Sequence, residues 1–237
     1  LDEKKLTKDD IIGIGLGVPG PVDDDGNVLK CINLGWGIFN VADELGKLTG
    51  MKVKAGNDAN VAALGEMWKG GAAGRKDVVM FTLGTGVGGG VIVGGKVLGG
   101  LNGAAGELGH FTVKFDSDAH HCNCGKAGCL ETVASATGIA REAKLYLAKV
   151  DTPSSLREME HITAKDVFDH AKEGDQVALH IVEQVGHYLG LACSYVAVTT
   201  NPETFVIGGG VSKAGAILTD IVEKYFKKYA FHAVTKT

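Results

Sequence analysis

Three of the five cysteines in this 237-residue chain fall within eight residues, at Cys122, Cys124 and Cys129. Thiolates at this spacing are typical ligands of a structural zinc ion. The alternative is disulfide bonding, but the number of cysteines in the cluster is odd and no signal peptide is visible. The spacing therefore predicts a zinc site, whereas Cys31 and Cys193 lie in apolar contexts and are expected to be buried thiols.

The fourth ligand of such a zinc ion is most often another cysteine or a histidine. His110 lies upstream of the cluster, and His120 and His121 directly precede it. A ligand adjacent to another ligand is geometrically awkward, so spacing alone slightly favours His110 and leaves the other two open. Glu107 and Glu131 flank the same region. A metal bound here would hold two carboxylates close together, which is one way to build a polar ligand site.

Two glycine-rich segments follow expected buried strands, at residues 83–90 (LGTGVGGG) and 207–212 (IGGGVS). Backbone N–H groups of glycines and the hydroxyl of Thr85 at a strand end can bind a phosphate. The alternative is a tight hairpin whose glycines only satisfy turn geometry. The first segment is neither a Walker loop, which continues with Gly-Lys-Ser/Thr, nor a dinucleotide fingerprint, which continues into a helix. Two such strand ends in one chain favour a nucleotide bound between them.

The pair Asn57 and Asp58 stands at the start of an expected helix. Both residue types are common helix N-caps, so capping alone is one interpretation. The functional interpretation makes Asp58 a general base that accepts the proton of a hydroxyl group, with Asn57 orienting that hydroxyl. The residues themselves leave both interpretations open.

The order of apolar runs, glycines and helical periodicities predicts an α/β fold. Strands are expected at 11–18, 53–55, 78–83 and 204–207, hairpins at 22–29 and 90–98, and helices at 41–48, 60–69, 134–147, 164–173, 175–198 and 211–229. The helix at 60–69 is expected to present Val61, Leu64 and Met67 with Trp68 on one face. Strands that end in glycines and lead into helices favour a parallel-rich sheet with ligands at the strand ends.

The composition limits the classes of partner. A net charge of -4 and a pI near 6.1 argue against nucleic acid, and the aromatic residues, at 6%, are too dispersed for a base-stacking platform. The longest apolar stretches are broken by glycine, so no membrane span is expected. Free thiols without an export signal favour a reducing cytoplasm. Glycine, with 36 residues, has about twice its usual share and marks turns and close backbone approaches.

Together these motifs resemble the ROK family, which includes repressors, uncharacterised open reading frames and sugar kinases. The resemblance covers essentially the whole chain, is closest to the bacterial glucokinases of the family, and rests on residues 56–58 (GND), 83–90, 107–110 (ELGH) and 122–131 (CNCGKAGCLE). It implies an α/β actin-like ATPase fold, related to ribonuclease H, with two lobes and a cleft. Residues 1–60 would be the remnant of the small lobe, and residues 61–237 the large lobe with the zinc loop and the nucleotide and sugar sites.

The resemblance also implies a role for each motif residue in the phosphorylation of a hexose, glucose above all, by ATP and Mg²⁺. Asp58 would be the catalytic base for the O6 hydroxyl. The residues that would bind sugar hydroxyls are Asn57, Glu107, His110 and Glu131. The ligands of the structural zinc would be His110, Cys122, Cys124 and Cys129, so that His110 serves metal and sugar through different ring nitrogens. Thr85 and Gly86 would meet the ATP phosphates, and Gly209 and Gly210 would lie near the adenosine.

One feature departs from the family pattern. Family kinases begin with a strand carrying Asp-x-Gly-Gly-Thr, which binds phosphate and Mg²⁺, and this chain has no such motif. The expectation is that the motif lies before Leu1, that this chain by itself is inactive, and that the whole protein is a kinase. The competing class is a sugar-responsive repressor of the same family, which carries a DNA-binding helix-turn-helix in front. The intact Asp58 and the two glycine-rich strand ends favour the kinase.

A third class is a zinc-stabilised sugar-binding module without catalysis. Glucose leads among the substrates by resemblance, and N-acetylmannosamine, fructose and allose are the alternatives. The family commonly forms dimers or tetramers, so a homodimer or homotetramer is expected, with the hexose and ATP as small-molecule partners and neither nucleic acid nor membrane.

Overall fold

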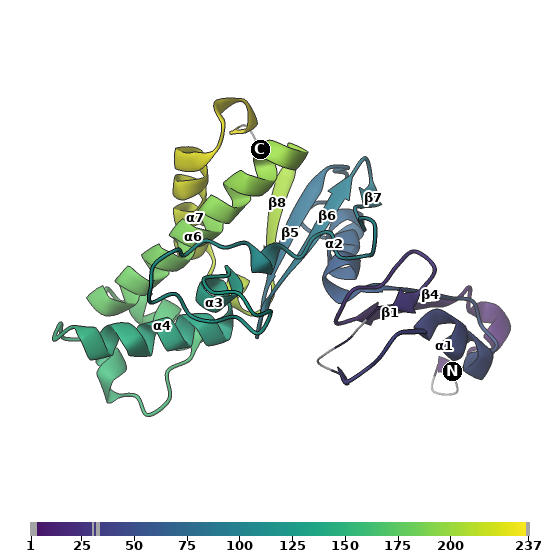
Figure 1. The fold of residues 1–237 in the computed structure, drawn as a ribbon, viewed down its shortest axis with the longest axis horizontal. Helices are drawn as coiled ribbons and strands as arrows, with labels where there is room; N and C mark the ends of the chain where they lie inside the picture. Colours follow the sequence, from purple (N-terminus) through teal and green to yellow (C-terminus); the bar gives the residue numbers. More distant parts are fainter. Residues whose placement is uncertain (1–3, 30, 32–33, 236–237) are drawn as a thin grey trace.

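The computed structural model describes residues 4–29, 31 and 34–235 of the chain (Figure 1). A small N-terminal part with strands β1 and β4 and helix α1 lies at one end of the molecule. A larger body with the remaining sheet and the long helices lies at the other end (Figure 1). The α/β class expected from the sequence is confirmed.

The N-terminal part contains two short strand pairs and one helix. They are the parallel pair β1 (Ile14–Val18) and β4 (Val53–Asn57), the antiparallel pair β2 (Asn27–Val28) and β3 (Phe39–Asn40), and helix α1 (Val41–Thr49). The α1 helix begins where the Asn40 side chain accepts a hydrogen bond from the Asp43 N–H. The hairpin expected at 22–29 is present but short: Val22 and Val28 form an antiparallel bridge, and the N–H groups of Asp23 and Leu29 donate to Asn27 O and Pro21 O.

The main sheet has four strands in the order β7-β6-β5-β8. Their bounds are β5 (Val78–Leu83), β6 (Val87–Val93), β7 (Lys96–Val97) and β8 (Thr204–Gly208). Strand β5 is antiparallel to β6 and parallel to β8, with Thr82 opposite Gly208. The carboxyl ends of β5 and β8, each followed by glycines, therefore lie side by side at one edge of the sheet.

Helices cover the sheet and form most of the buried core. Besides α2 (Asp58–Lys69), they are α3 (Glu131–Ala134), α4 (Ala136–Lys149), α5 (Ala164–Lys172), α6 (Gln176–Thr200) and α7 (Ala216–Tyr229). Single 3-10 turns lie at Lys8–Asp10, Leu108–His110, Ser155–Glu158, Val211–Ala214 and His232–Val234. Gly190 in α6 lets α7 approach closely, since a Cβ there would lie 2.7 Å from the Tyr225 Cβ. None of the helices in the described residues is long and apolar enough to cross a membrane.

One predicted helix is interrupted and another begins later than expected, each for a local reason. The segment expected as one helix at 211–229 is divided by Gly215, whose φ of 75° belongs to the left-handed region, into a 3-10 turn and α7. The helix expected at 134–147 is α4, which starts at Ala136 because Ser135 caps it through its side chain; the short helix α3, which ends at Ala134, was not predicted. Cys31 and Cys193 are buried free thiols, as expected.

The apolar side chains expected on one face of the helix at 60–69 lie mostly on its exposed side. Helix α2 exists and starts at Asp58; its Trp68 is 75% exposed, whereas Met67 is partly buried and packs against the core cluster that contains Ala63. The residues exposed in this way are Val61, Leu64 and Trp68, and the buried ones are Ala59, Asn60 and Ala63. The reason lies in β6, where a Cβ on Gly90 would come within 2.6 Å of the Ala63 Cβ. Small residues face small residues, so the helix lies too close to the sheet for a large side chain between them.

Candidate functional site

Four residues with metal-ligand chemistry gather beside α3. The ligand atoms of His110, Cys122, Cys124 and Cys129 all lie within 4.8 Å of one another. The Cys124 and Cys129 sulfurs are 3.6 Å apart, and His110 Nδ1 lies 3.6 Å from the Cys122 sulfur. With Zn–S bonds of about 2.3 Å, tetrahedral thiolates are about 3.8 Å apart, so the set fits zinc. His120 and His121 do not join this group.

Backbone pairing between two distant segments creates the cluster. The Leu130 N–H donates to Phe111 O, and the Val113 N–H donates to Gly128 O, which brings His110 beside Cys129. Gly128 has a φ of 73°, and a Cβ on it would lie 1.8 Å from Lys114 O. Only glycine permits this approach.

The protein alone disfavours three thiolates at this site. Burial raises the pKa of the Cys129 thiol to about 12 and also raises the pKa of Cys122. For Cys124, burial acts in the same direction but is outweighed by hydrogen bonds from the Lys126 N–H and the neighbouring thiols, so its pKa is lowered. A bound cation would supply the charge that stabilises the other two thiolates.

The two carboxylates expected beside the cysteine cluster, those of Glu107 and Glu131, both lie close to it. Glu107 Oε2 lies 3.8 Å from His110 Nε2, on the ring edge opposite the cysteines. Glu131 Oε1 lies 3.8 Å from the Cys122 sulfur, while its Oε2 accepts a hydrogen bond of 3.0 Å from the Val87 N–H. The His110 ring therefore has one nitrogen toward the cysteines and the other toward a carboxylate.

The start of α2 separates the two interpretations of Asn57 and Asp58. The Asn57 Oδ1 accepts from the N–H groups of Ala59 and Asn60 at 3.0 and 3.1 Å, so Asn57 is the N-cap. Its Nδ2 donates to Gly20 O at 3.2 Å. Asp58 is the first residue of the helix, exposed, and its Oδ1 accepts only from the adjacent Ala59 N–H. Capping thus accounts for Asn57 and leaves the Asp58 carboxylate available to a ligand.

The two glycine-rich strand ends lie together, as the sequence suggests, but some of their glycines serve backbone packing rather than a phosphate site. A Cβ on Gly209 would lie 2.4 Å from Leu83 O, so the turn after β8 packs directly against the end of β5. Thr85 and Gly86 form the turn that leads into β6. Gly88 and Gly90 lie within β6 and face α2, where a Cβ would collide with Thr82 or Ala63. These two glycines allow close packing, so only residues 84–86 remain as the expected phosphate site.

Sequence reasoning did not single out the start of α4 as part of this edge. The Thr137 hydroxyl donates to Thr85 O at 2.9 Å, and the Ala136 N–H donates to Gly84 O at 2.8 Å. Ser135 caps the 14-residue helix by accepting from the Gly138 N–H. The positive end of the helix dipole therefore lies beside the 84–86 turn. The Ser-Ala-Thr sequence before a helical run is an N-cap signature and could have indicated this.

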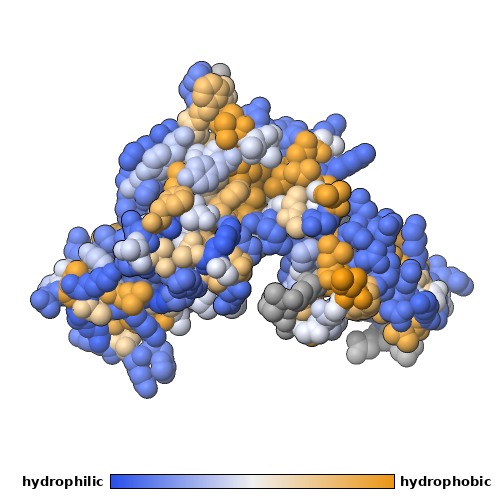
Figure 2. Space-filling view, in the orientation of Figure 1, coloured by the Kyte–Doolittle hydropathy of each residue, from blue (hydrophilic) through white to orange (hydrophobic). Residues whose placement is uncertain are grey.

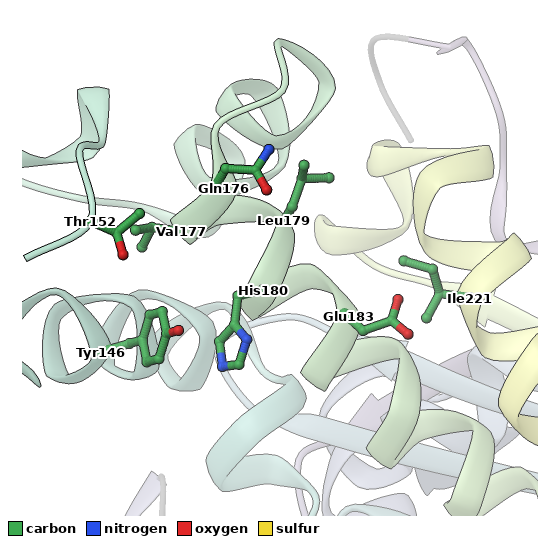
Figure 3. A pocket seen from close by; sticks show the side chains of 8 residues that line it. All are labelled: Tyr146, Thr152, Gln176, Val177, Leu179, His180, Glu183 and Ile221. Atoms are coloured by element: carbon green, nitrogen blue, oxygen red, sulfur yellow. The ribbon is translucent and has the colours of Figure 1, made fainter. Parts of the chain in front are cut away.

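The space-filling view shows a wide notch between the N-terminal part and the body that carries α3 and α4 (Figure 2). A separate cavity of about 490 Å³ lies on the helical face of the body, among α4, α6 and α7. Tyr146 and His180 stack there with ring centroids 4.0 Å apart (Figure 3). None of the candidate residues lines this cavity.

The similarity of this chain to known proteins extends over nearly its whole length. The sequence profile of the ROK family matches residues 1–237. The chain belongs to the ROK family. A glucokinase of Halalkalibacterium halodurans is 49% identical over 232 residues, which are 96% of this chain and 70% of that protein. A glucokinase of Thermotoga maritima is 41% identical over 86% of this chain, and the chain spans 66% of its length.

Solved ROK structures show the same actin-like ATPase fold. A ROK family glucokinase from Streptomyces griseus, in complex with glucose and AMPPNP, superimposes with a TM-score of 0.79 at 33% identity, covering 93% of this chain and 72% of that one. A ROK family transcriptional regulator superimposes with a TM-score of 0.85 at 32% identity, covering 94% of this chain and 56% of the regulator. Fold similarity alone therefore does not separate ROK kinases from ROK regulators.

The His/Cys cluster is consistent with the zinc motif of the ROK family. The structure resolves the choice that spacing left open, because His110 joins the cysteines and the two later histidines do not. Of the remaining motif residues, Thr85, Gly86, Gly209 and Gly210 follow strands β5 and β8 at the carboxyl edge of the main sheet, and Asn57 and Asp58 lie at the start of α2.

Proposed function

We propose that the whole protein to which this ROK chain belongs is an ATP-dependent hexokinase that phosphorylates glucose at O6. The 49% identity to the Halalkalibacterium halodurans glucokinase supports the substrate. The observation that carries the proposal is the exposed Asp58 carboxylate, which begins α2 while a neighbouring residue fulfils the capping role. Asn57 is the helix cap, and the carboxylate of Asp58 accepts only the adjacent Ala59 N–H among the described residues, so its other oxygen is available to act as a base.

The sugar would lie between the start of α2 and the cluster beside α3. Asp58 accepts the O6 proton, and its negative charge favours attack of that oxygen on phosphorus. Glu107, His110 and Glu131 bind other hydroxyls. Asn57 uses its oxygen for the helix cap and one N–H for Gly20, so its remaining N–H is available to the sugar.

A structural zinc would be held by His110, Cys122, Cys124 and Cys129. When bound, it supplies positive charge that keeps the thiols ionised and fixes the loop from which Glu131 follows. The His110 Nδ1 faces the cysteines, so its Nε2, which lies 3.8 Å from Glu107 Oε2, would contact the sugar together with that carboxylate.

The nucleotide would bind along the carboxyl edge of the main sheet. ATP with Mg²⁺ supplies the phosphoryl group. The backbone N–H groups of Thr85 and Gly86 would contact its phosphates, helped by the positive end of α4. Gly209 and Gly210, after the adjacent parallel strand, would lie near the adenosine.

The division into a small-lobe remnant at 1–60 and a large lobe at 61–237 is part of the proposal. Residues 1–3, 30 and 32–33 of the first region lie outside the described residues. The division at 60/61 falls in the first turn of α2, whose Ala59 already packs on β6, so we move the proposed boundary to the start of that helix at Asp58. By likeness to the family we also propose a cytoplasmic homodimer or homotetramer.

A second candidate is a sugar-responsive repressor. A xylose repressor of Caldicellulosiruptor bescii is 31% identical over 94% of this chain. Other sugars are also possible substrates of a kinase, since an N-acetylmannosamine kinase of Escherichia coli is 36% identical over 82% of the chain.

A coupled assay of ADP release by the whole protein, with glucose, N-acetylmannosamine, fructose and allose in parallel, tests the proposal. We expect ADP release that depends on glucose and is greatest with it. Highest turnover with another hexose would overturn the substrate assignment. No turnover with any hexose, together with DNA binding that responds to a sugar, would establish the repressor instead.

A further inference from the structure

Asn60 is a buried polar residue for which neither capping nor core packing accounts. It lies in the first turn of α2, is only 8% exposed, and its side-chain oxygen has no hydrogen-bond partner. An unpaired buried amide oxygen costs about 1–3 kcal/mol, so a protein without a use for it would do better with an apolar residue there.

The unpaired oxygen faces the segment that carries Glu107. A Cβ placed on Gly106 would lie 3.5 Å from Asn60 Oδ1, and Gly106 itself has a φ of 89°. Among the hydrogen bonds of the described residues, the N–H groups of Gly106 and Glu107 have no acceptor, whereas those of Ala105 and Leu108 do. An unpaired acceptor and two unpaired donors thus lie on facing segments.

The glycines of β6 make this arrangement possible. Gly88 and Gly90 admit α2 on one face of the strand. On the other face, a Cβ on Gly89 would lie 2.3 Å from Gly106 O, so the Gly106 segment also lies against the strand. Asn60 is therefore at the point where the helix that begins with Asp58 meets the segment that ends with Glu107.

We propose that Asn60 is a positioning residue: when a sugar is bound, its amide oxygen, which is unpaired in this structure, accepts the Gly106 or Glu107 N–H and so holds Glu107 and Asp58 at the distance at which both contact one sugar molecule. This inference rests on the proposed function, because the residues it positions are those proposed to bind the hexose. A displacement of about 1 Å between such groups can cost about 100-fold in rate.

The test replaces Asn60 by leucine, which has a similar volume and no polar atom, in the whole protein. If Asn60 has no positioning role, Asn60→Leu only removes an unpaired polar group. Thermal stability then rises, and the KM values for glucose and for ATP stay unchanged. If Asn60 positions Glu107, stability is kept or raised, yet the KM for glucose rises about 10-fold to 100-fold while the KM for ATP does not change. Asn60→Ala should show the same split if the leucine variant fails to fold.

Asn102→Ala, at an exposed position of the same segment, is the matched control and should leave both constants unchanged. The wild-type assay separates two kinds of failure. If the wild type phosphorylates glucose but Asn60→Leu and Asn60→Ala have a normal KM for glucose, the positioning role is wrong and the proposed function stands. If the wild type neither binds nor phosphorylates a hexose, the proposed function is wrong and the inference falls with it.

Discussion

Glu131 accepts a hydrogen bond of 3.0 Å from the Val87 N–H, 44 residues away in sequence. Its other carboxylate oxygen lies 3.8 Å from the Cys122 sulfur. One side chain therefore connects the cysteine cluster to the turn at 84–86 that we propose for ATP phosphates. A change at the metal cluster can reach the phosphate turn through this carboxylate.

Replacing Glu131 by glutamine keeps an oxygen acceptor for Val87 and removes the charge. Since hydrogen bonds to a charged group are worth about 1.5–3 kcal/mol, we expect glucose affinity to fall about 10-fold to 100-fold in the whole protein. Zinc content should stay at about one per chain, because Glu131 is not in the ligand set. Titration calorimetry with glucose and metal analysis of the same sample measure both. Unchanged affinity would remove Glu131 from the sugar site.

Cys124→Ala should release the zinc and also weaken glucose binding. Groups around a metal are held by its ligands, and loss of that support typically costs about 10-fold to 100-fold in affinity or activity. Cys193→Ala, a buried thiol outside the cluster, is the control and should keep its zinc. If Cys124→Ala loses zinc but binds glucose normally, the sugar does not lie beside the metal.

Asp58→Asn should abolish most turnover while glucose still binds. A well-placed general base contributes about 10²–10⁴-fold to the rate, and asparagine keeps the shape without the ability to accept the proton. The comparison is kcat from the coupled assay against glucose affinity from calorimetry. Asp25→Asn, at an exposed position of the N-terminal part, should behave as wild type. Near-normal kcat in Asp58→Asn would show that Asp58 is not the base.

Two glycine-to-alanine changes test the close packing of α2 on β6. Gly90→Ala would place a Cβ 2.6 Å from Ala63 Cβ and 3.0 Å from Ala59 O, so we expect a loss of about 1–3 kcal/mol in the free energy of unfolding. Gly65, on the outer side of the same helix, has no atom within 4 Å of an added Cβ. Gly65→Ala should therefore stabilise by about 0.5–1 kcal/mol. Denaturant unfolding measures both, and equal effects would contradict the proposed contact.

The ionisation of Asp175, the N-cap of α6, should make the free energy of unfolding depend on pH. Its side chain accepts from the N–H groups of Val177 and Ala178 and from Ser154 and Ser155. Burial opposes ionisation, but these hydrogen bonds outweigh it and lower the pKa of Asp175. The folded state therefore gains stability above the unfolded pKa of about 3.9, and loses it as pH falls through the lower folded value.

Asp175→Ala should accordingly cost about 1–2 kcal/mol at neutral pH, as expected for the loss of a helix cap. The difference from wild type should shrink when unfolding is measured below about pH 3.9. Asp169→Asn, which removes the exposed ion pairs with Lys165 and Lys172, should change stability little at either pH. A difference that grew at acid pH would show that the Asp175 carboxylate is not the stabilising form.

Local spacing determined those features that depend on residues close in sequence. The Cys122, Cys124 and Cys129 spacing is enough to indicate a metal, since the three thiols fall in one loop and nearby thiolates repel unless a cation binds them. The glycine-terminated strands and the helix starting near Asp58 also follow from local patterns. These signals need no knowledge of which segments pack together.

Tertiary packing decided the features that depend on distant segments. Which histidine joins the cysteines was left open by spacing and depends on the pairing of residues 110–114 with 128–130. The exposure of the large apolar residues of α2 was not predicted, because it depends on the glycines of β6, which leave room for Ala59 and Ala63 against the strand but not for a large side chain. The bond from Val87 to Glu131 joins residues that no local pattern relates. Each of these contacts joins residues that are far apart in the sequence. It therefore forms only when the chain folds and brings the two partners together.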